Sequence, residues 1–330
     1  MQHLPAGGFS RALPGSRPLV AVVGATATGK SDLAVLLARV LDGEVINADS
    51  MQLYRGMDIG TAKLTDAERD GVPHHLLDIW DVTTTASVAE YQRAAIDVID
   101  DIRGRGKSPI LVGGSGLYIR AALGDLEFPG TDDAVRQRLE AELAAGGPAP
   151  LYARLRDQDP KAAAAILPSN GRRIVRALEV IEISGRPFSA TMPAYTTPPA
   201  GADGPVQIGL LLERPELDRR IDARVDRMWA QGFDREVRDL EAVGLRDGKT
   251  ASRALGYQQM LRHFDGDWTL DQAREETARA TRRFARRQES WFRRDPRVTW
   301  LPATDDLPSR ALSAIRDNSP AATAPTRGGT

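Results

Sequence analysis

The sequence lacks cysteine altogether in its 330 residues. Disulfides, thiolate metal sites and cysteine nucleophiles are therefore excluded. Lysine is scarce, with five residues against 39 arginines. A GC-rich genome can account for most of this bias, and phosphate recognition by planar guanidinium groups is the functional alternative. The net charge of −1 excludes a chain-wide field that would select a partner.

Long apolar runs are also missing. None approaches the roughly 18 residues of a membrane span, and residues 1–18 hold no apolar segment of signal-peptide length. We therefore expect a soluble, cytoplasmic protein. Residues 1–17 are rich in Pro, Gly and Ala, and we expect them to form a disordered arm. We expect residues 311–330 to form a disordered tail.

One loop carries the strongest signal in the chain. An apolar run at 19–23 precedes it, and an amphipathic pattern typical of a helix follows it. Strand, G-x-x-x-x-G-K-[ST] and helix together define a P-loop, whose backbone N–H groups bind phosphate oxygens. The predicted phosphate-binding residues are Gly24, Ala25, Thr26, Ala27, Thr28, Gly29, Lys30 and Ser31. Lys30 adds a cation and the Ser31 hydroxyl can ligate Mg²⁺, so the chain is predicted to bind a di- or triphosphate.

Strands alternate with helices on either side of this loop. Further strands are predicted at 44–49, 109–112, 206–212 and 298–301, and a helix at 88–102. This alternation predicts an α/β fold with a P-loop NTPase-like parallel sheet flanked by helices. The segment 131–205 is Ala- and Arg-rich and reads as an all-helical insertion domain between two parts of the core, 18–130 and 206–310.

Asp49 follows the second predicted strand. Carboxyl ends of parallel strands share one edge, so Asp49, the P-loop and the turn 113–116 should converge on one crevice. Three roles stay open for Asp49: a Mg²⁺ ligand, a general base, or a cap of the next turn. Neighbouring His74 and His75 have no metal-ligand spacing and are expected in a loop.

Arginines recur on the predicted helix 215–230. Arg220, Arg224 and Arg227 form a stripe beside the apolar face. They either pair with the three aspartates of the same helix or clamp a pyrophosphate, and spacing alone does not decide.

Two further regions are strongly basic. The predicted helix 270–294 carries eight arginines against three glutamates, and Arg172, Arg173 and Arg176 cluster in the insertion. Each is either a solvated surface or a site for a phosphate backbone. Two basic patches on a P-loop protein favour a long polyanion over a small metabolite.

Several longer blocks accompany the P-loop in a fixed order. They are DSMQLYRGMDIGTAK at 49–63, PHHLLDI at 73–79, VGGSGLY at 112–118, RRIVRALEV at 172–180 and GY at 256–257 with flanking Arg253. Over roughly residues 19–302 these blocks resemble the tRNA dimethylallyltransferases, also called tRNA isopentenyltransferases.

The resemblance implies a prenyl transfer reaction. A dimethylallyl group would move from dimethylallyl diphosphate to N6 of adenosine 37, next to the anticodon, in tRNAs reading codons that begin with U. The P-loop would hold the diphosphate with Mg²⁺ on Ser31 and with Arg224. Lys30 and Arg220 would stabilise the leaving charge, and Asp49 would take the amine proton. The resemblance also implies a monomer.

The same resemblance implies a set of tRNA-binding residues. They are Asp49, Ser50, Met51, Gln52, Ser115, Arg136, Arg172, Arg173, Ile174, Val175, Arg176, Arg253, Ala254, Leu255, Gly256, Tyr257 and Gln258. Gln258 stands where the family commonly has a basic residue, which puts one phosphate contact in question.

Other functions compete with this interpretation. A P-loop kinase of a small metabolite would turn over ATP and would not need the arginine patches. Isopentenyl transfer to free adenine nucleotides, or RNA binding with a vestigial P-loop, are further alternatives. Whether ATP also binds the P-loop stays open.

Overall fold

The computed structural model describes residues 18–126, 130–191 and 204–318. Two compact units divide the chain: a core of Met1–Leu123 with Thr197–Thr330, and an insertion of Gly124–Thr196. The insertion was predicted at 131–205, and the unit found here begins and ends several residues earlier. In the described part of the chain, no helix has the length and apolar character needed to cross a membrane.

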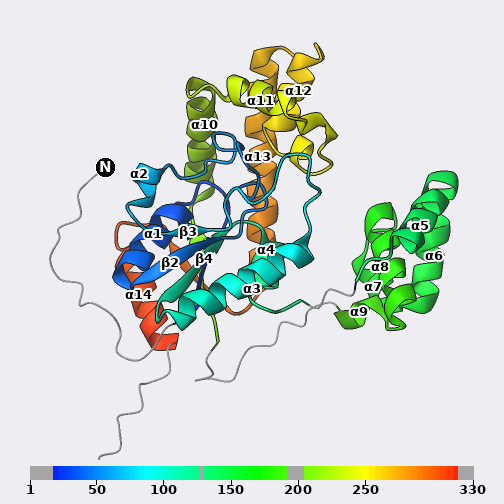
Figure 1. Ribbon diagram of the computed structural model, residues 1–330, viewed down its shortest axis with the longest axis horizontal. Coiled ribbons are helices and arrows are strands. Elements are labelled where there is room, and N and C mark those ends of the chain that lie inside the picture. Colours follow the sequence, from blue (N-terminus) through cyan, green and yellow to red (C-terminus); the bar gives the residue numbers. More distant parts are fainter. Residues whose placement is uncertain (1–17, 127–129, 192–203, 319–330) are drawn as a thin grey trace, which may run out of the picture. The chain divides into compact units, whose positions relative to one another are not determined.

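The core is built on one parallel sheet (Figure 1). Within the described residues its six strands run in the order β3-β2-β4-β1-β5-β6. Their bounds are β1 Val20–Gly24, β2 Gly43–Asn47, β3 His74–His75, β4 Ser108–Gly113, β5 Val206–Leu211 and β6 Val298–Pro302. The predicted α/β class and parallel sheet are confirmed. The central strands are buried on both faces, which explains their continuous apolar runs.

Helices cover both faces of the sheet. α1 (Lys30–Val40) and α14 (Leu307–Asn318) pack on one face, and α3 (Val88–Gly104), α4 (Gly116–Ala122) and α13 (Leu270–Phe292) on the other. The short α2 spans Asp66–Arg69. On the first face, apolar side chains of α1 and α14 join those of β1 and β5 in one cluster.

A second group of helices extends the core beyond the sheet edge. They are α10 (Arg214–Ala230), α11 (Phe233–Ala242), α12 (Tyr257–Phe264) and the outer part of α13, with 3₁₀ turns at Leu245–Asp247 and Ala251–Arg253. Their aromatic core contains Tyr54, Phe233 and Tyr257. Because Tyr54 belongs to the loop after β2, this cluster anchors the segment that carries Asp49.

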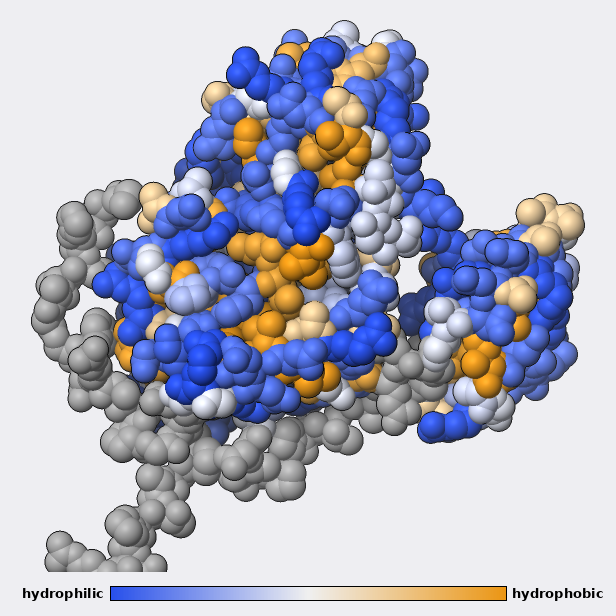
Figure 2. Space-filling model, viewed as in Figure 1, coloured by the Kyte–Doolittle hydropathy of each residue, from blue (hydrophilic) through white to orange (hydrophobic). Residues whose placement is uncertain are grey.

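The insertion is helical, as predicted. It contains α5 (Asp133–Gly146), α6 (Pro148–Gln158), α7 (Pro160–Ala165), α8 (Gly171–Ser184) and α9 (Phe188–Thr191). It has its own apolar core, which includes Leu139, Leu155 and Ile174. The visible face of this unit is mostly hydrophilic (Figure 2).

Two local predictions are wrong. His74 and His75, expected in a loop, form the edge strand β3, and the His75 ring bonds the buried carboxylate of Glu44 at 2.7 Å. The disordered tail expected from residue 311 is helical up to Asn318, because Ala311 and Ile315 continue an apolar stripe that the sheet buries. Residues 1–17 and 319–330, also expected to be disordered, lie outside the described residues.

Candidate active site

The P-loop forms one wall of a cavity of about 860 Å³. Ala27 and Gly29 have positive φ angles of 63° and 89°, a backbone pattern that turns successive N–H groups inward. The P-loop residues that line the cavity are Thr26, Ala27, Gly29, Lys30 and Ser31. The predicted members Gly24, Ala25 and Thr28 lie buried beneath them. They shape the loop, since the Thr28 hydroxyl donates to the Ala25 carbonyl at 2.8 Å.

Lys30 is the cation at the base of this cavity. Its Nζ donates to the carbonyl of Ala25 at 2.6 Å. Burial lowers the pKa of Lys30 from 10.5 to about 8; the charge of Asp49 opposes this shift and that of Arg224 adds to it. An anion in the cavity would favour the charged form, so Lys30 is poised to bind one.

Asp49 lies two residues beyond β2, held by a turn. Its N–H donates to Asn47 Oδ1 at 2.9 Å, and Asn47 Nδ2 donates to its carbonyl at 3.0 Å. Its own Oδ1 accepts the N–H of Met51 at 2.9 Å. Asp49 therefore does cap this turn. It also lines the P-loop cavity, so capping is not its whole role.

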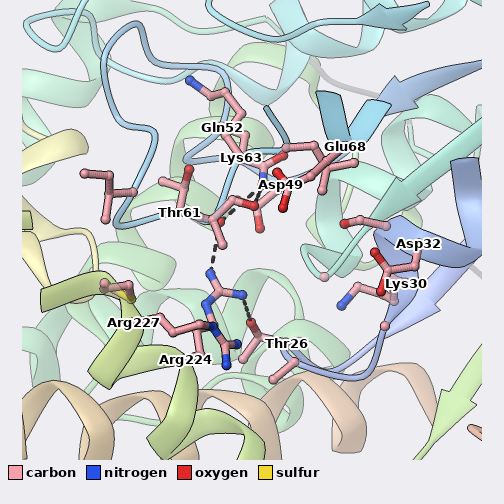
Figure 3. A pocket seen from close by; sticks show the side chains of 18 of the residues that line it. Thr26, Lys30, Asp32, Asp49, Gln52, Thr61, Lys63, Glu68, Arg224 and Arg227 are labelled. Atoms are coloured by element: carbon pink, nitrogen blue, oxygen red, sulfur yellow. Dashed lines mark hydrogen bonds between the residues drawn. The ribbon is translucent and has the colours of Figure 1, made fainter. Parts of the chain in front are cut away.

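Arg224 reaches the cavity from α10. Its Nη1 donates to the Thr26 hydroxyl at 2.9 Å and its Nη2 to the Thr61 carbonyl at 3.0 Å (Figure 3). Burial lowers the pKa of this guanidinium, and Asp49 opposes that shift. Arg227 also lines the cavity. Among the described residues, neither arginine pairs with a carboxylate.

Two of the three aspartates of α10 pair with another helix, and the third, Asp218, lies 3.9 Å from Arg214 outside the arginine stripe. Asp222 bonds Arg282, and Asp226 bonds Arg274 at 2.7 Å, so both neutralise α13. The alternative in which these two acids pair with the arginine stripe of their own helix is therefore wrong. Arg220 is the exception in that stripe, because it lines the cavity while bonding Glu216 at 2.6 Å.

A second, mostly apolar cavity of about 300 Å³ adjoins the first. The two share Thr26, Asp49, Thr61, Arg224 and Met228. The remaining wall of the second cavity includes Met51, Val225, Leu255, Tyr257 and Phe284. Asp49 thus stands at the junction between a polar, phosphate-binding space and an apolar one.

Gln288 of α13 connects two loops of the site, and no sequence pattern predicted this role. Its Oε1 accepts the N–H of Thr26, and its Nε2 donates to the Gly114 carbonyl, both at 2.9 Å. A Cβ at position 114 would lie 2.2 Å from this amide, which explains the glycine there. Beyond Gly114, the Ser115 and Ser50 hydroxyls lie 3.3 Å apart. Gln288 and these serines connect the P-loop to the turn that holds Asp49.

The loop between β2 and α2 supplies a further wall of the P-loop cavity. Gln52, a predicted tRNA-binding residue, lines this cavity, and its amide donates to the Thr61 carbonyl at 3.2 Å. Lys63 bonds Asp58 of the same loop and, at 2.6 Å, Asp78 of the segment after β3, and thereby ties the loop to that segment.

Oxygen donors in the P-loop cavity fit a small divalent cation. The Ser31 hydroxyl lines the cavity and has no hydrogen-bond partner among the described residues. Asp32 and Glu68 line the same cavity. Partial burial and the charge of Glu68 raise the pKa of Asp32, and the charge of Arg220 opposes this shift. Mg²⁺ prefers such donors together with phosphate oxygens and water. Among the described residues, no group of three or more His, Asp or Glu side chains lies close enough together to bind a metal ion by itself.

The predicted RNA-binding residues at the start of α8 include exposed and buried side chains. Arg172 and Arg173 are exposed, and neither forms an ion pair among the described residues. Ile174 and Val175 are 0% and 3% exposed, and their side chains lie in the core of the insertion, so any contact of these two residues with RNA would have to use other atoms.

Arg136 and Arg176 are engaged within the insertion. They bond the fully buried carboxylate of Glu179 at 2.7 and 2.9 Å. Desolvation raises the pKa of Glu179, but bonds from the two guanidiniums outweigh it and the net shift is downward. Both arginines therefore compensate a buried charge, whatever else they contact.

The predicted block at 253–258 is also divided. Arg253 and Gln258 are exposed, and Leu255 lines the apolar cavity. Ala254 and Tyr257 are buried, with the Tyr257 hydroxyl donating to Glu236 at 2.6 Å. Gly256 is buried as well, and its φ of 88° suits glycine alone. Arg253, Ala254 and Tyr257 also line the apolar cavity, and the predicted contact of this block with RNA stays a prediction.

Comparison with known proteins links this site to one family. The IPP transferase family model matches residues 52–295. A tRNA dimethylallyltransferase of Streptomyces coelicolor is 64% identical over 311 residues, which cover 93% of this chain and 98% of that protein. A tRNA dimethylallyltransferase of Kineococcus radiotolerans is 63% identical over 311 residues, covering 90% of this chain and 96% of that protein.

Solved structures give the same relationship. The tRNA isopentenylpyrophosphate transferase of Bacillus halodurans matches with a TM-score of 0.66 and 42% identity, covering 92% of this chain and 98% of that one. A eukaryotic dimethylallyltransferase acting on tRNA matches with a TM-score of 0.76 and 27% identity, covering 92% and 81% respectively.

Proposed function

Because the chain belongs to the IPP transferase family, we propose that it is a tRNA dimethylallyltransferase. It transfers a dimethylallyl group from dimethylallyl diphosphate to N6 of adenosine 37, beside the anticodon of tRNAs that read codons beginning with U. The observation that carries this proposal is the position of Asp49, which lines both the P-loop cavity and the apolar cavity.

The two cavities suit the two substrates. The P-loop N–H groups, Lys30 and Arg224 bind the diphosphate, so the five-carbon chain extends toward the shared wall at Met228. The adenine enters the apolar cavity from the other side. The attacking nitrogen and the leaving oxygen then lie on opposite sides of the reacting carbon, as displacement requires.

Bond formation and cleavage follow from this arrangement. N6 forms a bond to C1 of the dimethylallyl group while the bond from C1 to the diphosphate oxygen breaks. Lys30, Arg220 and Arg224 stabilise the charge that develops on the diphosphate. The amine becomes acidic only as its new bond forms, so Asp49 first orients it and then accepts one proton late in the reaction.

Mg²⁺, held by the Ser31 hydroxyl and phosphate oxygens, would offset further charge on the diphosphate. The adenosine must leave the stack of the anticodon loop to reach Asp49. We infer that the protein acts in the cytoplasm, where tRNA is found, and as a monomer, since one chain carries every residue of the proposed site.

The proposal is tested by incubating the protein with dimethylallyl diphosphate, Mg²⁺ and unmodified tRNA, followed by mass analysis of the nucleosides. N6-dimethylallyl-adenosine is the expected product. If it is absent and ATP is instead consumed to phosphorylate a metabolite, the chain is a kinase and the proposal fails.

Asp49→Asn tests the role of the carboxylate. Asparagine keeps the oxygen that accepts the Met51 N–H but cannot take a proton, so kcat should fall by about 100-fold or more while tRNA affinity stays within about twofold. Asp239→Asn on the exposed side of α11 is the matched control and should leave both unchanged. A near wild-type kcat for Asp49→Asn would remove Asp49 as the base.

A further inference from the structure

A third cavity, of about 290 Å³, lies between α12 and α13. Leu255 and Arg287 line both this cavity and the apolar one, so the two spaces adjoin. Its other walls include Gln258 and Arg262 of α12, Trp268, and Arg283 of α13. The sequence blocks described above do not include Arg262, Trp268, Arg283 or Arg287, and the proposed reaction leaves them without a role.

Positive charge dominates the lining of this third cavity. Three guanidinium groups face one carboxylate, that of Glu276, which Arg283 bonds at 2.9 Å. Arg287 is exposed and has no carboxylate partner among the described residues. Such a cavity attracts an anion, and an arginine fork suits a phosphate group.

A flat surface lies beside these charges. The Arg262 guanidinium lies over the Trp268 ring, with its central carbon 4.7 Å from the ring centroid. Asp267 is a weak partner for Arg262, at 3.7 Å, and the Arg262 side chain is half exposed. A guanidinium plane supported by tryptophan is a platform on which a nucleobase can stack.

Resting on the proposed transfer to tRNA, we propose that this cavity binds the nucleotide adjacent to the acceptor adenosine. Arg287 and Arg283 hold its phosphate, and its base stacks on the Arg262–Trp268 pair. An RNA strand whose adenosine enters the apolar cavity can continue past Leu255 and Arg287 into the third cavity, because both residues line the two spaces. An acidic peptide would use the charges but not the planar platform.

Binding of the unmodified anticodon stem-loop, measured without donor across a range of salt concentrations, tests this assignment. Arg287→Ala should weaken binding by about five- to tenfold and lower the slope of log Kd against log salt by about 0.7, the value for one phosphate contact on a single strand. Arg262→Lys keeps the charge and removes the plane, so it should weaken binding by about fivefold or more with an unchanged slope. Arg316→Ala on α14, an exposed arginine outside the three cavities, is the control.

Stem-loops with an abasic site on the 5′ or the 3′ side of the acceptor adenosine identify the stacked base. One of these two stem-loops should bind the wild-type protein about tenfold more weakly than the intact stem-loop does. For that stem-loop, Arg262→Lys should cause no further loss of affinity, because the base that stacks on Arg262 is already missing. The assignment is overturned if Arg287→Ala and Arg262→Lys bind the stem-loop like the control variant. It is also overturned if the affinity lost through the abasic site and the affinity lost through Arg262→Lys are additive. Formation of N6-dimethylallyl-adenosine by the wild-type protein tests the proposed function separately. If that product forms but the binding predictions fail, only the assignment of the third cavity is wrong.

Discussion

At the scale of single residues, the site depends on charges held out of water. Burial lowers the pKa of both Lys30 and Arg224 at the P-loop cavity, and the charge of Asp49 opposes the shift of each. Because the pKa of Lys30 is about 8, this group loses its proton over the range in which enzymes are commonly assayed. Binding of a diphosphate should therefore depend on pH.

The direction of this dependence follows from which form binds. The protonated ammonium binds the diphosphate, so kcat/KM for dimethylallyl diphosphate should fall as pH rises through about 8. Bound diphosphate favours the charged form, so kcat should persist to higher pH than kcat/KM. A pH series of initial rates measures both. In Lys30→Met the decline near pH 8 should vanish along with most of the activity; a decline that persists unchanged would belong to another group.

Among the elements of the fold, α13 has the widest influence on the site. It covers the sheet, pairs with two of the three aspartates of α10, and contributes Gln288 to the P-loop. Gln288 is 5% exposed, and both ends of its amide are used. The helix therefore positions Thr26 and the turn after β4 through one side chain.

Gln288→Glu should separate donor binding from RNA binding. The carboxylate can still accept the Thr26 N–H but cannot donate to the Gly114 carbonyl, and it adds negative charge beside the phosphate cavity. We expect KM for dimethylallyl diphosphate to rise by about tenfold or more, because a buried polar group loses its partner. The Kd for tRNA should stay within about twofold. Steady-state kinetics and filter binding measure the two, with Gln158→Glu on α6 as an exposed control. Equal changes in both constants would indicate general loss of structure instead.

The sequence predicted elements that are long and strongly patterned. The central strands are buried apolar runs, and the P-loop sequence has few alternative conformations. The sequence therefore predicted β1, α1 and the place of Asp49 just after β2. β3 has two residues and its side chains are only half-buried, so no periodicity could reveal it. Gln288 was hidden because its partners are backbone groups 262 and 174 residues away. The role of Arg224 depended on where the aspartates of α10 point, and spacing along one helix cannot determine that.

At the scale of the whole molecule, the two units have different proposed roles in RNA binding and chemistry. The core holds the three cavities, whereas the insertion carries Arg172 and Arg173 on its surface. Neither of these arginines compensates a buried acid, in contrast to the pair that binds Glu179. The insertion should therefore contribute affinity for RNA and leave the chemical step to the core.

The double variant Arg172→Ala with Arg173→Ala tests this division. We expect Kd for tRNA to rise by about five- to tenfold in moderate salt and its salt slope to fall by about one to two, because phosphate contacts are lost. The value of kcat at saturating tRNA should not change. Arg156→Ala, an exposed arginine of the same unit, is the control. An unchanged salt slope in the double variant would remove this pair from the RNA interface.

The strand order also governs how the protein is made. β1 lies between β4 and β5, and the whole insertion is translated before β5. During synthesis one edge of β1 therefore lacks its partner for about 180 residues, or roughly ten to forty seconds at common elongation rates. The insertion, which has its own core, emerges from the ribosome during this interval. The P-loop strand can be locked in place only after β5 arrives, so the nascent chain carries an exposed apolar edge that chaperones can recognise.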